Sequence, residues 1–232
     1  MKHLVPSLLL SLALLAPCVR ADEKSAEQKV NVGAMVTDMM KMQINGDQQQ
    51  LIMWMPFEFF VACGTAQGDS WEAASKAMEG FKAYHVVCVM RQVTNADGTS
   101  SYATADQMAS SVVLRGPNGE EVQSISKVPP KVSSMAAVMR QAMSQQGGAQ
   151  ADNMRLLSFP RQINGKDFGT ADEKGKFTIE LKQVDRFDAL TVTYHTPFDA
   201  LKPQHECPKC HEMVSAKWNF CAYCGEKQEA AK

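Results

Sequence analysis

The sequence predicts an α+β fold, in which a mostly antiparallel β-sheet body with about three helices precedes a small module at the C-terminus. Two observations predict the body: apolar residues recur at helical spacing in short segments, and apolar runs of strand length lie between turn residues. A third predicts the module, because four cysteines stand in two close pairs after residue 205. We therefore expect the body over residues 34–200 and the module over residues 205–226.

The first half of the body is expected to contain two helices and a long buried strand. Apolar residues on one face predict a helix over residues 34–44. The apolar run 51–63 does not alternate, so it predicts a strand buried on two faces, with Pro56 at a bulge or an edge. Ser70 is a capping residue and predicts that a short helix follows it.

The second half is expected to be richer in strands. An apolar strand is predicted over residues 84–93, and a hairpin turn at residues 116–119. Two alternating runs, 177–181 and 190–195, predict strands with one apolar face each. An amphipathic helix is predicted over residues 133–147. Its apolar positions are Met135, Val138, Met139, Ala142 and Met143.

The N-terminus has the pattern of a secretory signal peptide. The apolar run 8–16 is shorter than the roughly 20 residues that span a bilayer, and Ala21 ends a segment that fits the cleavage rule. We expect residues 1–21 to be removed and the mature chain, which has no segment of membrane-spanning length, to be periplasmic or secreted. A lipoprotein anchored through Cys18 is the alternative, although Pro17 departs from the small residue usual before such a cysteine.

Two CxxC pairs near the C-terminus predict a metal site. Zinc prefers four soft ligands at the corners of a tetrahedron, and each CxxC turn places two sulfurs on one side of the ion. An all-cysteine set leaves no open position for catalysis, so a structural Zn²⁺ is expected. Two disulfides or a redox pair are the alternatives, and the redox pair lacks a βαβ context. The expected ligands are Cys207, Cys210, Cys221 and Cys224.

These residues resemble the small zinc-ribbon family, whose pattern is CPxCG, a short hairpin, an aromatic residue and CxxCG. Residues 207–210 match the first half of the pattern and residues 220–225 the second. His211 stands where glycine is common, and that position often needs a positive φ. The resemblance implies a zinc-stabilised module for binding or spacing, and it implies nothing about the body. His205 and His211 flank a ligand set that is already complete, so we expect both to be surface residues.

Three residues of the body could support other chemistry. Cys63 and Cys88 both lie in apolar runs, so a disulfide and two buried thiols are equal alternatives. Glu58 is a single charge inside an apolar run, where burial would raise its pKa, but we expect it to point outward beside Pro56. An enzyme built around Glu58, Cys63 or His85 is the weakest hypothesis.

The chain contains 15 methionines, which suggests two interpretations. The clusters 39–42 and 53–55 would suit Cu(I), which thioethers bind. Met35 and Met39 stand at helical core spacing, however, where methionine fills gaps between other side chains. We expect core packing, and copper or zinc handling in the periplasm is the alternative function.

The composition and the motifs of the chain argue against several classes of function. The 24 Lys and Arg balance 25 Asp and Glu, and no basic block could neutralise a run of phosphates, so nucleic acid is not an expected partner. The chain also lacks HExxH, GxSxG and a glycine-rich phosphate loop. We therefore expect an exported, non-enzymatic protein that binds an unknown protein or ligand of the cell envelope.

Overall fold

The computed structural model describes residues 30–130, 132–134, 137, 141, 145, 150–202, 204–215 and 218–228. The expected signal peptide, residues 1–21 with Cys18, lies outside these residues. So do the five apolar positions of the helix expected over residues 133–147, although Ser133 and Ser134 at its start are helical. In the described part of the chain, no helix combines the length and the apolar character needed to cross a bilayer.

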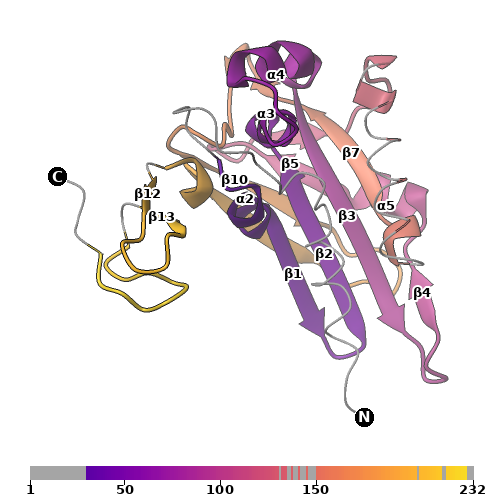
Figure 1. Ribbon diagram of the computed structural model, residues 1–232. Coiled ribbons are helices and arrows are strands. Elements are labelled where there is room, and N and C mark those ends of the chain that lie inside the picture. Colours follow the sequence, from indigo (N-terminus) through magenta and orange to yellow (C-terminus); the bar gives the residue numbers. More distant parts are fainter. Residues whose placement is uncertain are drawn as a thin grey trace.

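Two antiparallel sheets form the body (Figure 1). In the larger sheet the order is β1-β2-β3-β4, and β7 pairs with β3 as well. In the smaller sheet the order is β11-β10-β5-β6. The larger sheet consists of β1 (Met40–Asn45), β2 (Gln48–Met55), β3 (Tyr84–Thr94), β4 (Ser100–Tyr102) and β7 (Arg155–Pro160). The smaller sheet consists of β5 (Val112–Arg115), β6 (Glu121–Gln123), β10 (Gly175–Leu181) and β11 (Leu190–Thr196).

Besides the partly described helical segment that includes Ser133 and Ser134, the structure describes four complete α-helices and two short 3-10 helices, more than the three helices expected. Figure 1 shows α3 and α4 together at one end of the larger sheet. The α+β class and the antiparallel sheets are confirmed. The helices are α2 (Val32–Met39), α3 (Phe57–Thr65), α4 (Trp71–Met78), α5 (Ala105–Ser111), η2 (Glu79–Phe81) and η3 (Asp199–Leu201). The short strands are β8 (Gln162–Ile163), β9 (Lys166–Asp167), β12 (Gln204–Glu206) and β13 (Met213–Ser215).

The two sheets share one apolar core around Trp54 of β2. Its ring meets Phe177 of β10 edge-on, with centroids 4.6 Å apart, and Tyr194 of β11 at 5.5 Å. The Tyr194 hydroxyl donates to the carbonyl oxygen of Met39 at 2.8 Å and accepts from the Trp54 amide at 3.3 Å. The buried phenol is thereby satisfied, and it connects both sheets to the end of α2.

The strand expected over residues 51–63 is wrong in its second half. β2 ends at Met55, Pro56 is the N-cap residue of the next helix, and α3 takes up Phe57–Thr65. Proline has no N–H for a strand ladder, and its fixed φ, here −71°, suits the entry to a helix. The apolar run therefore continues through a change of secondary structure, and it is buried as a strand first and a helix afterwards.

The helix expected over residues 34–44 is also wrong in its second half. α2 ends at Met39, and β1 continues directly into a hairpin with β2. Gly46, at φ +60°, forms the turn of that hairpin instead of ending a helix. Pairing with β2 over the whole of β1 satisfies the backbone of this segment and outweighs its helical periodicity.

The other elements follow their sequence signals. The Ser70 hydroxyl accepts from the amide of Ala73 at 3.2 Å and caps α4 as expected. β5 and β6 form the expected hairpin, and alternate residues of β10 lie in the core. The methionine side chains of the expected clusters also pack in the core, where Met35, Met39, Met53 and Met55 are at most 1% exposed.

Candidate metal centre

The C-terminal module consists of one small hairpin and two tight turns. β12 pairs antiparallel with β13, and the first cysteine turn connects them. A bridge between Phe220 and Lys227 closes the second cysteine turn. Figure 1 shows this module as a compact unit beside the body, and we call residues 205–228 the ribbon.

The two cysteine turns have the same backbone geometry. The amide of His211 donates to the carbonyl of Cys207 at 3.0 Å, and the amide of Gly225 donates to the carbonyl of Cys221 at 2.9 Å. Both donors have a positive φ, +62° for His211 and +73° for Gly225. His211 therefore adopts the backbone conformation for which the zinc-ribbon pattern uses glycine.

These turns bring the four expected sulfurs together. Cys207 Sγ lies 3.7 Å from Cys224 Sγ, and Cys210 Sγ lies 3.6 Å from Cys221 Sγ. All four sulfurs lie within 4.8 Å of one another. A tetrahedral zinc site with Zn–S bonds of about 2.3 Å has sulfur–sulfur edges of about 3.8 Å. The separations fit such a site and exceed the roughly 2.05 Å of a disulfide.

The charge state of the cluster also favours a cation. Burial opposes ionisation of Cys207, but hydrogen bonds from the backbone of Cys210 and Lys209 lower its pKa to about 6. At Cys210 a backbone hydrogen bond at Glu212 acts in the same direction, yet burial and the neighbouring sulfurs raise the pKa to about 12. Without a cation the cluster would keep protons, whereas a divalent ion would stabilise all four thiolates.

The cysteines also form the interior of the ribbon. Among the described residues of the ribbon, Cys207, Val214 and Cys221 form the buried apolar group. Cys210, Trp218 and Cys224 pack around them, partly buried. Since four of these six residues are cysteines, little apolar surface remains to hold the ribbon together without an ion.

Comparison with known families supports this reading of the geometry. Residues 191–225 match the double zinc ribbon family. The match begins in β11 of the body, and its four cysteines supply one complete four-thiolate set. No curated protein and no solved structure matches the chain.

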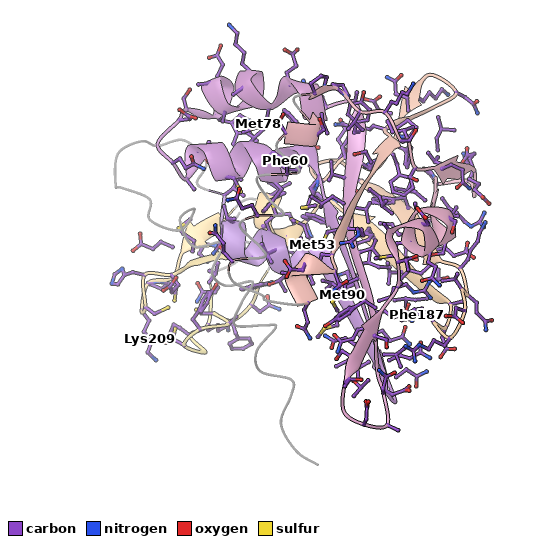
Figure 2. All side chains as sticks on the ribbon, turned by 90° about the vertical axis from the view of Figure 1, so that its right-hand side faces the viewer. Met53, Phe60, Met78, Met90, Phe187 and Lys209 are labelled. Atoms are coloured by element: carbon purple, nitrogen blue, oxygen red, sulfur yellow. The ribbon has the colours of Figure 1, made fainter. Side chains whose placement is uncertain are left out.

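The histidines beside the cluster have partners of their own. His211 is exposed, and its Nδ1 lies 2.5 Å from Glu206 Oε1. His205 is half-buried, so its expected surface position is only partly correct, and its Nε2 lies 2.9 Å from Gln228 Oε1. Across the cluster, Lys209 pairs with Glu226 at 3.1 Å. Figure 2 shows Lys209 on the ribbon, well apart from Met53 and Met90 of the body.

The expectation that Glu58 points outward is wrong. Glu58 lies in the first turn of α3 and is 7% exposed. Burial is the main cause that raises its pKa; nearby Asp172 raises it further, and Arg161 opposes the shift. The error follows from the strand prediction, because a helix starting after Pro56 turns this side chain towards the interior.

Cys63 and Cys88 do not form a disulfide. Cys63 lies in α3, whereas Cys88 is a fully buried free thiol in β3. Burial raises the pKa of Cys88 to about 12, so this residue is an inert core thiol. Of the other residues considered for chemistry, His85 is buried and its Nδ1 accepts from Trp54 Nε1 at 3.2 Å.

The sequence does not predict one residue that lies beside the cluster. Gln228 follows the last cysteine turn, outside the module expected over residues 205–226, and its side chain is buried. Its side-chain amide donates to Cys207 Sγ at 3.5 Å. No spacing rule points to this position, and the chain of contacts becomes visible only in three dimensions.

Proposed function

We propose that this chain is an exported, non-enzymatic protein whose ribbon binds one structural Zn²⁺ and whose α+β body binds a protein or ligand of the cell envelope. The observation behind the zinc assignment is the closed cluster of four sulfurs at tetrahedral separations. Zn²⁺ bound by Cys207, Cys210, Cys221 and Cys224 would cross-link the two turns. A closed four-thiolate set supplies stability and leaves no position for a substrate.

Export rests on the signal-peptide pattern of residues 1–21. The non-enzymatic binding role rests on the lack of HExxH, GxSxG and a glycine-rich phosphate loop in the sequence and on the ribbon, whose family pattern implies a module for binding or spacing. Apolar side chains on the ribbon surface, Phe220 at 60% and Tyr223 at 57% exposure, are consistent with contacts to another molecule.

The first experiment measures metal, thiols and the N-terminus of the same preparation. Protein is recovered from the cell envelope fraction, its metals are quantified, and its thiols are counted with and without denaturant and chelator. Mass spectrometry then reads the first residue of the mature chain. We expect one zinc per chain, four thiols that react only after chelation, and a chain that begins at Asp22.

Three results would change this proposal. No zinc and no free thiols in the ribbon would overturn the metal site and indicate disulfides. Intact Met1 or a lipidated Cys18 would change the proposed location to the membrane, through an uncleaved anchor or a lipid. Retained copper, or labile zinc beyond one equivalent, would favour metal handling over a structural ion.

A further inference from the structure

We propose that Gln228 is a positioning residue of the zinc site, which holds the Cys207 thiolate by an amide N–H···S hydrogen bond and is itself held by His205. This inference rests on the proposed zinc site. It adds an outer residue that neither the CxxC spacing nor the match over residues 191–225 includes. It extends the ribbon beyond the last cysteine turn.

The Gln228 amide group is fully engaged although the ribbon is small. Its Nε2 donates to Cys207 Sγ at 3.5 Å and to the carbonyl oxygen of Glu226 at 2.8 Å. Its Oε1 lies 2.9 Å from His205 Nε2. The side chain is 4% exposed, whereas the neighbouring Lys227 is exposed to solvent. A glutamine is rarely buried without such a set of partners.

The carbonyl oxygen of Glu226, which can only accept, determines which end of the amide faces the metal ligand. An amide oxygen can only accept, so His205 Nε2 must be the donor in this pair. The Gln228 NH₂ group is then directed to the other side, towards Cys207 and Glu226. In this chain of hydrogen bonds, His205 therefore donates to Gln228, and Gln228 donates to Cys207.

The backbone fixes the start and the end of this arrangement. The backbone N–H of Gln228 donates to the carbonyl oxygen of Asn219 at 2.9 Å, so the residue is anchored beside the second cysteine turn. His205 lies in β12, two residues before Cys207. Gln228 thus connects the two halves of the ribbon through the metal ligand, and not only through their backbones.

A hydrogen bond to a zinc-bound thiolate has two expected effects. It holds the sulfur in the orientation that the ion requires, and it withdraws charge from a site where four thiolates surround one divalent ion. Loss of such an outer partner typically lowers metal affinity about 10- to 100-fold. We expect this loss when the donor is removed.

The experiment compares zinc affinity among variants of the full chain, measured by competition with a chromophoric chelator. Gln228→Met removes both polar ends at similar volume, and Gln228→Glu keeps the shape but replaces the donor by a carboxylate oxygen. Lys227→Ala is the matched control at an exposed neighbouring position. We expect weaker binding in Gln228→Met, still weaker binding in Gln228→Glu, and parental binding in Lys227→Ala.

A spectroscopic readout separates the hydrogen bond from packing. In the Co²⁺-substituted protein, loss of an N–H donor raises the electron density on Cys207 Sγ, so the sulfur-to-metal charge-transfer band should move to lower energy. His205→Ala should produce part of the same shift. Combined with Gln228→Met, it should add little, because both changes interrupt one chain of contacts.

Two outcomes overturn the inference without affecting the zinc assignment. The first outcome is that the parent chain binds one zinc and that Gln228→Met and Gln228→Glu bind zinc as tightly as the parent does. The side-chain amide of Gln228 would then have no role in metal binding. Weaker binding with an unchanged Co²⁺ band in both variants would show that Gln228 acts through packing alone. If the parent chain binds no zinc at all, the proposed metal site fails first.

Discussion

The body and the ribbon of this protein are held together by different interactions. In the body, large apolar side chains of two sheets and several helices meet in one continuous core, in which Trp54, Phe177 and Tyr194 are nearly inaccessible. In the part of the ribbon that the structure describes, the buried apolar group consists of Val214 and two cysteines, and the other two cysteines lie around them. A core of that size stabilises a fold weakly, so we expect the ribbon to depend on a bound ion for its folding and the body not to.

The largest expected effect is unfolding of the ribbon while the body stays folded. Cys221→Ser removes one of four thiolates, so we expect zinc to dissociate and the ribbon to unfold, because metal binding and ribbon folding are one equilibrium of roughly 10–16 kcal/mol. Thermal unfolding of the body should be unchanged. Zinc content and a melting curve check this. A variant that retains a full equivalent of zinc would contradict the four-thiolate site.

The matching change in the body is Trp54→Ala. Its ring lies between the two sheets and contacts Phe177, Tyr194 and Phe198. Truncation should reduce the free energy of unfolding of the body by about 3–5 kcal/mol, measured by urea denaturation. Zinc content should stay at the parental value. Loss of zinc in this variant would show that the ribbon needs the body in order to fold.

The next effect is expected from acid. Burial, the main cause, and nearby Arg161 lower the pKa of His85 from 6.5 to about 3. The unfolded chain therefore binds a proton that the folded body excludes, and stability is lost as the pH falls below 6.5 towards 3, by about 1.4 kcal/mol per pH unit. His85→Gln should flatten this slope in urea titrations between pH 7 and about 4. Equal slopes in variant and parent would show that His85 is protonated in the folded body.

The smallest effect concerns Glu58, and its pH dependence of stability is opposite to that of His85. Its pKa is raised above 4.5 because the carboxyl is buried, so stability is present at low pH and is lost as the pH rises through the raised value. Glu58→Gln should remove this loss and stabilise the body at pH 8. The comparison at pH 4 should show a smaller difference. A destabilised variant at pH 8 would instead indicate that the ionised carboxylate is required.

The two regions also differ in how well the sequence predicts them. The ribbon is specified by a local pattern, so Cys207, Cys210, Cys221 and Cys224 were expected together and are found together. The positive φ of His211, which stands where the family pattern has glycine, was also predictable from its place in the turn. Gln228 was not predictable, since its contacts depend on how the second cysteine turn folds back on the first.

In the body, the errors arise where one apolar segment changes its secondary structure. Burial on all sides looks the same in a strand and in a helix, so residues 51–63 gave no periodic signal at the change after Met55. Pro56 marked the position, but it was read as an irregularity within a strand. Glu58 was therefore expected to point outward beside Pro56, whereas the helix that holds it buries it.

The claim that the body folds by apolar burial and the ribbon by metal binding is tested most directly by amide hydrogen exchange, read residue by residue before and after removal of zinc with a chelator. We predict that protection is lost over residues 205–228 and retained in β2, β3 and β10. Protection lost in both regions together would show a single folding unit. Protection retained in the metal-free ribbon would show that zinc is not what holds it.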